Sequence, residues 1–277
     1  MDYWKYCLRT EDSTATEVLL AYLSEAPFDS FEEPPGGLDA YLPATPSNIA
    51  AAESLLTDLQ ERFPFQWEKH FLPAQNWNAI WEANFPPVVI EDFCAVRAPF
   101  HSPIPSVGYE LIIEPKMAFG TGHHETTWMC LRALRDVPCS QRRLLDFGCG
   151  TGVLAILAAR LGAAEVIAVD VEEESFRSTI ENSAANGVSD RVRAYCGSVE
   201  AVPAGTFDGI LANINRNVIL AALPQLSARL NRSGWLVVSG ILLSDEETIG
   251  TVAEGVGLNR QHRYERGQWL CLIFEKG

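Results

Sequence analysis

The sequence predicts an α/β protein in which a doubly wound, mostly parallel sheet follows a smaller α/β domain. From residue 144 onward, short apolar runs alternate with helical patterns, which is typical of a parallel sheet with helices on both faces. A glycine-rich turn over residues 146–152 joins the first of these strands to its helix. Before residue 73, shorter patterns follow the order βαββαβ, which is typical of a ferredoxin-like sandwich.

The first 72 residues supply the smaller domain. Trp4, Tyr6 and Leu8 alternate with polar residues, which is the period of a half-buried strand. Apolar residues then recur on one face of a helix that ends near Leu23, and a second helix opens at Pro46. The predicted elements are, in order, residues 4–9, 15–23, 28–31, 38–42, 46–59 and 65–71.

Residues 73–87 differ from the segments on either side. Prolines open and close this stretch, and Trp77, Trp81 and Phe85 lie between them at helical spacing. We interpret it as a linker helix that packs its tryptophans on a neighbouring domain. The predicted organisation is therefore an N-terminal domain over 1–72, a linker helix over 73–87 and a larger domain over 88–277.

The larger domain begins with two predicted strands, over 88–97 and 109–114, and a helix over 128–135. Strands and helices then alternate, and the last two strands are expected to form an antiparallel hairpin at the edge of the sheet. The later strands are predicted at 144–146, 166–169, 191–196, 207–213, 234–239, 258–265 and 268–275, and the helices at 153–159, 172–186, 218–230 and 245–256.

The turn after Asp146 carries glycine at positions 148, 150 and 152. Without a Cβ, Gly148 and Gly150 allow a sharp turn and the close approach of a ligand, toward which the next helix points free N–H groups. Asp170 ends the following apolar run, 22 positions after Gly148, where a carboxylate accepts hydrogen bonds from ribose hydroxyls. The pattern predicts a nucleoside cofactor. The alternative is a structural corner with a solvated Asp170.

Residues 119–127 form a second glycine-containing stretch, Phe-Gly-Thr-Gly-His-His-Glu-Thr-Thr. Two glycines flank Thr121, which indicates a mobile loop, and the loop leads into the N-terminus of a helix. Such a loop either lies over a ligand or is only a turn. His123, His124 and Glu125 are clustered titratable groups near the predicted site.

Composition limits the class of protein further. The 277 residues are 47% hydrophobic and 21% charged, and no apolar run reaches the length of a membrane span. Seven scattered cysteines without a Cys-x-x-Cys pair favour a reducing compartment over a disulfide framework or a metal site. The first residues also lack the basic end and apolar core of a signal peptide. We expect a cytoplasmic monomer without a bound metal.

The net charge of −15 bears on the partners. A nucleic-acid-binding protein usually carries a basic patch, and the densest basic stretches, Arg132–Arg143 and Arg260–Arg266, are short. We therefore expect no direct sequence-specific binding of nucleic acid. Thirteen acidic and four basic residues give the first 72 residues a net charge of −9, which suits a basic partner, although acidity also serves solubility alone.

Four motifs together resemble the ribosomal protein L-eleven methyltransferase family. Because position 153 is Val, the glycine turn departs from a dinucleotide fingerprint and is similar to the first motif of class I S-adenosylmethionine-dependent methyltransferases. The other motifs are Trp77-x-x-x-Trp81-x-x-Asn84-Phe85, Phe119-Gly120-Thr121-Gly122-x-His124-x-Thr126-Thr127 and Ala212-Asn213-Ile214.

The resemblance implies a Rossmann-like class I methyltransferase domain with S-adenosyl-L-methionine as the cofactor. It implies repeated methylation of lysine ε-amino groups and of the N-terminal α-amine of the basic ribosomal protein L-eleven, which the domain over 1–72 would recognise. The family's cofactor contacts fall on Thr127, Gly148, Asp170 and Asn213, and Gly150 joins them through the glycine turn. Asn213 would place its amide near the transferred methyl group.

The resemblance leaves the proton transfer open. His124 is a candidate general base, and the alternative is that the acceptor amine loses its proton to water before it docks. His123 and Glu125 stand where the family pattern has a small polar residue and a proline, and Ser198 replaces the acid that many methyltransferases place near the adenine.

Two other functions fit part of the pattern. In an RNA or other protein N-methyltransferase, Asn213-Ile214-Asn215 would take the place of an Asn-Pro-Pro-Tyr motif, but both prolines and the aromatic residue are absent. A non-catalytic cofactor-binding assembly partner would tolerate loss of the glycines or of Asp170, and all of these are present.

Overall fold

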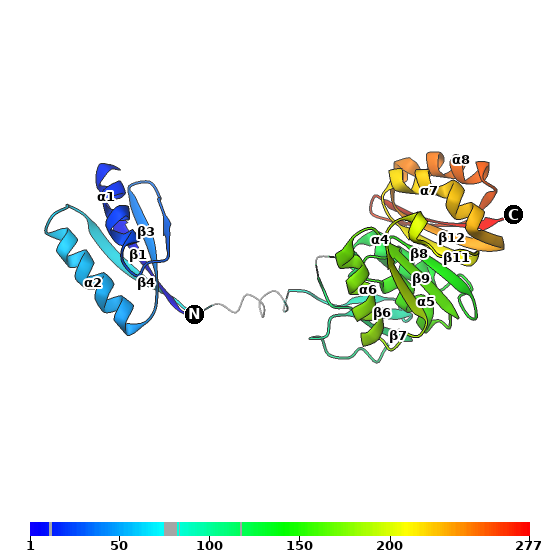
Figure 1. Ribbon diagram of the computed structural model, residues 1–277, viewed down its shortest axis with the longest axis horizontal. Coiled ribbons are helices and arrows are strands. Elements are labelled where there is room, and N and C mark those ends of the chain that lie inside the picture. The colour runs from blue at the N-terminus through cyan, green and yellow to red at the C-terminus, as the bar shows by residue number, and fades with distance from the viewer. Residues whose placement is uncertain (11–12, 75–81, 83, 117) are drawn as a thin grey trace. The chain divides into compact units, whose positions relative to one another are not determined.

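The computed structural model describes residues 1–10, 13–74, 82, 84–116 and 118–277. The chain divides into two compact units, Met1–Asn84 and Phe85–Gly277 (Figure 1). Most of the predicted linker helix over 73–87 lies outside the described residues, so that helix and the boundaries drawn around it stay predictions.

Unit 1 has the predicted βαββαβ order. Its four strands are antiparallel to their neighbours and are arranged β2-β3-β1-β4, which is the order of a ferredoxin-like sandwich. Tyr6 and Leu8 of β1 share one apolar core with Leu19 of α1 and Leu56 of α2, so both helices cover the same face of the sheet. The elements are β1 (Tyr3–Arg9), α1 (Ser13–Ser24), β2 (Ser30–Glu32), β3 (Gly37–Pro43), α2 (Pro46–Gln60) and β4 (Gln66–Leu72).

Unit 2 is built on a seven-stranded sheet in the order β10-β9-β8-β11-β12-β14-β13. Five strands, from β10 to β12, are parallel, and the closing hairpin pairs through β14, which is antiparallel both to β12 and to β13. One apolar core includes residues of α4 and α5, and a second includes residues of α7 and α8. This arrangement confirms the predicted doubly wound fold class.

The order of the parallel strands reverses between β8 and β11. Chain order runs outward from β8 through β9 to β10 on one side, and from β11 to β12 on the other. Open α/β sheets bind their ligands outside the carboxyl ends of the strands at such a reversal. The elements are β8 (Arg143–Phe147), α5 (Val153–Arg160), β9 (Glu165–Asp170), α6 (Glu173–Ala185), β10 (Val192–Cys196), η1 (Val199–Ala201), β11 (Phe207–Asn213), α7 (Arg216–Arg229), β12 (Leu230–Leu242), η2 (Leu243–Asp245), α8 (Glu246–Gly255), β13 (Leu258–Arg266) and β14 (Trp269–Lys276).

A second, three-stranded sheet precedes the main one, in the order β5-β6-β7. The prediction of one strand over 88–97 is wrong, because the chain turns at Glu91, whose φ is +51°, and continues as an antiparallel strand. Glu91 is held there by Arg132 and Arg135, whose guanidinium nitrogens lie 3.1 Å and 2.9 Å from its carboxylate. The elements are β5 (Val88–Ile90), β6 (Cys94–Arg97), β7 (Tyr109–Ile112) and α4 (Glu125–Ala133). None of the described helices is long and apolar enough to cross a membrane.

Candidate active site

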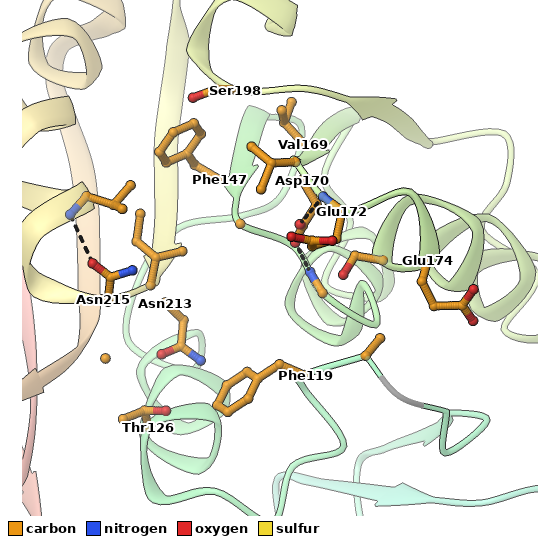
Figure 2. Close-up of a pocket in the computed structure, with 18 of the residues that line it drawn as sticks. Phe119, Thr126, Phe147, Val169, Asp170, Glu172, Glu174, Ser198, Asn213 and Asn215 are labelled. Carbon is orange, nitrogen blue, oxygen red and sulfur yellow. Dashed lines mark hydrogen bonds between the residues drawn. The ribbon is translucent and has the colours of Figure 1, made fainter.

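A cavity of about 1030 Å³ opens at the carboxyl ends of β8, β9 and β11, where the strand order reverses (Figure 2). Figure 2 shows Asp170 and its backbone donors on one side of it, and Asn213 with Phe119 and Thr126 on the other. The residues that line it are Ala118, Phe119, His124, Thr126, Phe147, Gly148, Gly150, Val169, Asp170, Val171, Glu172, Glu174, Ser175, Gly197, Ser198, Asn213, Ile214, Asn215, Val218, Gly240 and Trp269.

The glycine turn forms part of the cavity wall. Gly148 and Gly150 have φ values of +80° and +54°, a backbone region that favours glycine. A Cβ on Gly148 would lie 2.1 Å from Ile214 Cγ2, and one on Gly150 would lie 2.1 Å from the carbonyl oxygen of Phe119. Both positions therefore require glycine, and the main chain faces the cavity directly.

Asp170 lies at the end of β9 and lines the same cavity. One carboxylate oxygen accepts the N–H of Gly150 at 2.9 Å, and the other accepts the N–H of Glu172 at 3.0 Å. A carboxylate offers about four lone-pair positions, so two remain for other donors. This geometry fits the two hydroxyl groups of a ribose.

Asn213 ends β11 on the opposite side of the cavity. Its amide nitrogen donates to the hydroxyl of Thr127 at 3.3 Å, whereas its buried amide oxygen has no hydrogen-bond partner in the described part of the chain. A buried acceptor without a donor costs about 1–3 kcal/mol. An N–H donor brought by a ligand would remove this cost, so the site fits a group that carries an amine.

Thr127 lies behind Asn213 rather than on the cavity wall. It is 1% exposed and is not among the lining residues, whereas its neighbour Thr126 is. In this geometry Thr127 acts on the site through Asn213, and its direct contact with the cofactor stays a prediction.

His124 lines the cavity and also begins α4. Its Nδ1 accepts the backbone N–H of Thr126 at 3.3 Å and lies 2.8 Å from the Thr126 hydroxyl. Since a neutral imidazole carries one proton, this bond assigns that proton to Nε2. The imidazole stands between two other rings, with centroids 5.2 Å from Phe119 and 4.7 Å from Trp269.

The three residues that depart from the family pattern each have a defined place in the structure. His123 Nε2 lies 2.8 Å from the carbonyl oxygen of Pro86, and its Nδ1 lies 3.1 Å from the Thr121 hydroxyl. Glu125 is in the first turn of α4, where a carboxylate is favourable beside the positive end of the helix dipole. Ser198 lines the cavity, beside the end of β10.

Several lining residues carry no signal in the sequence. Trp269 comes from β14, and its place beside His124 depends on how the closing hairpin pairs with β12. Val218 and Gly240 likewise reach the cavity only through the packing of α7 and β12. Phe119, by contrast, does carry a signal in the sequence, because it adjoins the glycines of the loop motif.

Asp146, the first residue of the glycine motif, does not line the cavity. It is fully buried, and Ala155 N–H donates to one of its carboxylate oxygens at 3.1 Å. Burial raises its pKa to about 7, and the charge of Asp170 acts in the same direction. Asp146 therefore belongs to the support of the turn.

Comparison with known proteins supplies the family. The model of the family described as ribosomal protein L11 methyltransferase (PrmA) matches residues 23–277. A ribosomal protein L11 methyltransferase of Porphyromonas gingivalis is 42% identical over 268 residues, covering 94% of this chain and 91% of that protein. One from Bacteroides fragilis is 39% identical and covers 99% of both chains.

Solved structures agree with this result. The ribosomal protein L11 methylase of Lactobacillus delbrueckii subsp. bulgaricus is similar with a TM-score of 0.64 and 28% identity, covering 70% of this chain and all of that one. A methyltransferase from Pyrococcus furiosus, with a TM-score of 0.51, 22% identity and coverage of 60% of this chain and 89% of that one, shares the fold. The chain belongs to the ribosomal protein L11 methyltransferase family.

Proposed function

We propose that this S-adenosylmethionine-dependent methyltransferase methylates amino groups of ribosomal protein L11, namely lysine ε-amino groups and the N-terminal α-amine, in the cavity beside Asn213. The observation that carries the proposal is the amide oxygen of Asn213, which has no hydrogen-bond partner among the described residues and lies across the cavity from Asp170 and the glycine turn. A carboxylate that can accept hydrogen bonds from ribose hydroxyls and an amide oxygen that can accept one from an amine thus line the same cavity.

Gly148, Gly150 and Asp170 form the cofactor side. Asp170 would accept hydrogen bonds from the ribose hydroxyls, and the two glycines would let the cofactor approach the main chain. When bound, S-adenosylmethionine supplies an electrophilic methyl group on a sulfonium sulfur. The protein's main task is then to align the acceptor amine with that methyl group.

Asn213, Phe119 and Trp269 form the acceptor side. The Asn213 oxygen would accept an N–H of the amine and so fix the direction of its lone pair. The aromatic walls would exclude water from the amine. A free lysine at pH 7 costs about 4.6 kcal/mol to deprotonate, and partial burial lowers its pKa and this cost.

His124 is the candidate base, and its geometry favours the alternative, in which the amine loses its proton to water before docking. Nδ1 accepts the Thr126 N–H, so in the neutral ring Nε2 is a donor. We assign His124 to the start of α4 and to the aromatic wall of the cavity.

Unit 1 would recruit the substrate. Residues 1–72 carry a net charge of −9, and complementary charge speeds encounter with a basic protein and fixes its orientation. The acidic balance also supports a protein substrate over RNA. All seven cysteines are free thiols, which supports a cytoplasmic location, and we propose a monomer because both units bury their own cores.

The test is methyl transfer from labelled S-adenosylmethionine to purified L11, to total ribosomal proteins and to ribosomal RNA. We expect L11 to gain methyl groups in intact-mass spectra, and peptide mapping to place them on lysines and on the N-terminus. Label confined to RNA or to another protein would contradict the substrate. Cofactor binding without transfer to any of the three would favour an assembly partner.

A further inference from the structure

A buried threonine joins the two sides of the cavity. Thr151 lies between Gly150 and Gly152 and is 0% exposed. Its backbone N–H donates to the carbonyl oxygen of Phe119 at 2.8 Å, and its hydroxyl donates to the carbonyl oxygen of Gly120 at 2.7 Å. One residue of the glycine turn is thus bonded to two successive carbonyl groups of residues 119–124, which we call the acceptor loop.

The acceptor loop and the glycine turn also pack so closely that an added Cβ on Gly120 or on Gly150 would clash with the other segment. Gly120 has φ +113°, and a Cβ there would lie 2.7 Å from the Thr151 hydroxyl. On the other side of the contact, a Cβ on Gly150 would meet the Phe119 carbonyl oxygen. The stretch predicted to be a mobile loop is therefore fastened to the glycine turn at its first two residues, and displacement of the turn moves Phe119.

Helix α6 fixes the turn from the opposite side. Asn182 donates to the carbonyl oxygen of Thr151 at 2.9 Å, and Thr179 donates to that of Gly150 at 3.0 Å. Asn182 also accepts the N–H of Glu114, in the chain that leads toward the loop. Thr151 is consequently held in a defined position between a rigid helix and the loop.

We propose that Thr151 is a positioning residue that couples cofactor binding to acceptor binding. Gly150 and Asp170 face the cofactor side, whereas Phe119 and His124 line the acceptor side. Contacts with the nucleoside would fix the conformation of the glycine turn. Because Thr151 is bonded to the carbonyl groups of Phe119 and Gly120, these contacts would also fix the wall of the cavity that receives the amine. Such coupling is reciprocal, so a bound acceptor also tightens the cofactor. This inference rests on the proposed function.

The test measures the affinity of the full-length enzyme for L11 with and without S-adenosylhomocysteine, the demethylated cofactor. In the parent enzyme we expect S-adenosylhomocysteine to increase the affinity for L11 about fivefold or more. Thr151→Val removes the hydroxyl and leaves the shape of the side chain nearly unchanged. We expect this variant to lose most of the tightening of L11 binding by S-adenosylhomocysteine and to have a lower kcat/KM for L11. Its affinity for S-adenosylhomocysteine alone should stay within about twofold, and Thr151→Ser should restore the coupling.

Thr179→Val is the matched control, because it removes a buried hydroxyl of α6 that donates to the glycine turn at Gly150, and it leaves the hydrogen bonds between the turn and the loop in place. It should retain the coupling factor even if it weakens cofactor binding. Equal coupling in Thr151→Val and in the parent enzyme would overturn the inference, and so would equal loss in both variants. If L11 fails to bind the parent enzyme at all, the proposed substrate is wrong instead.

Hydrogen exchange on the unmodified enzyme gives a second measurement that needs no variant. With S-adenosylhomocysteine added and no acceptor present, the amides of residues 119–124 should slow together with those of 148–152. Protection confined to the glycine turn would contradict the coupling, whichever way the variants fold.

Discussion

Two carboxylates flank the glycine turn in opposite environments. Asp170 lines the cavity and accepts two backbone N–H groups, whereas Asp146 is fully buried and has one donor, the N–H of Ala155. The second oxygen of Asp146 has no partner in the described part of the chain. Asp170 is therefore suited to ligand binding, whereas Asp146 affects the stability of the fold in a way that depends on its protonation.

Asp146 makes the stability of unit 2 sensitive to pH. Its pKa of about 7 in the folded protein lies above the ordinary 3.8, so the folded state binds more protons than the unfolded chain between these values. The free energy of unfolding should therefore fall as the pH rises through this window, by up to about 4 kcal/mol. Asp146→Asn cannot ionise. Its free energy of unfolding, measured with denaturant, should therefore rise relative to that of the parent protein between pH 5 and pH 8.

The control for this prediction is Glu174→Gln, which neutralises a carboxylate of the cavity wall that does not act on the pKa of Asp146. Its stability relative to the parent should change less with pH. A difference between Asp146→Asn and the parent protein that is the same at pH 5 and at pH 8 would mean that Asp146 stays ionised in the folded state.

Asp170 carries the prediction for cofactor affinity. Asp170→Ala should weaken S-adenosylmethionine binding by roughly 1.5–3 kcal/mol, the range for hydrogen bonds to a charged group. Isothermal calorimetry measures the change. Glu174→Ala, which removes another carboxylate of the cavity wall, should cost less. An unchanged affinity in Asp170→Ala would remove Asp170 from the cofactor site.

At the scale of elements, α4 begins three residues before its predicted start at Trp128. His124 supplies the N-cap with Nδ1, and Glu125 occupies the first turn. Histidine is not among the preferred N-cap residues Ser, Thr, Asp and Asn, so the residue types of this stretch give no signal for a helix start at His124. The cap also explains why the acceptor loop stops at His124.

This cap separates two roles for His124. His124→Ala should lower the free energy of unfolding by about 0.5–2 kcal/mol, the usual cost of a lost N-cap. His124→Asn restores a cap acceptor without an imidazole, so it should regain stability and more methyl-transfer activity than the alanine variant. If both variants lose activity equally and the acidic limb of the pH–rate profile vanishes, His124 is the general base after all.

The elements that the sequence predicted best are those with strong local signals. Strands β8, β9 and β11 end in Phe147, Asp170 and Asn213, each within a residue of its predicted end, because glycines or polar residues stop their apolar runs. Strand β12 runs from Leu230 to Leu242 and is much longer than predicted, since it pairs with β14 as far as Leu242 and with Phe207 of β11 at Leu230. Pairing of this kind lies outside any local pattern.

At the scale of the whole molecule, some contacts of the site depend on which elements lie next to each other in space. The closing hairpin was predicted, but β14, the last strand in the chain, lies between β12 and β13, and this brings Trp269 to the cavity. Likewise, Asn182 and Thr179 resemble ordinary polar residues of a helix, yet they fix the glycine turn. The candidate site was thus predictable on its cofactor side, where the motif is contiguous, and less so on its acceptor side.

The separate roles proposed for the two units can be tested by truncation. Unit 2 contains the whole cavity and both apolar cores of the larger sheet, so Phe85–Gly277 should fold alone. After removal of residues 1–84, we expect S-adenosylmethionine to bind as before and the rate of L11 methylation to fall roughly tenfold or more, because electrostatic recruitment is lost. Calorimetry and intact-mass kinetics measure the two quantities.

Salt distinguishes recruitment from simple solubility. Charges on unit 1 are screened beyond about 8 Å at physiological ionic strength, so kcat/KM of the full-length enzyme for L11 should fall as salt rises. The truncated enzyme, already without the −9 charge of residues 1–72, should respond less to salt. Full-rate methylation of L11 by the truncated enzyme would show that the acidic unit serves solubility alone and that unit 2 recognises the substrate unaided.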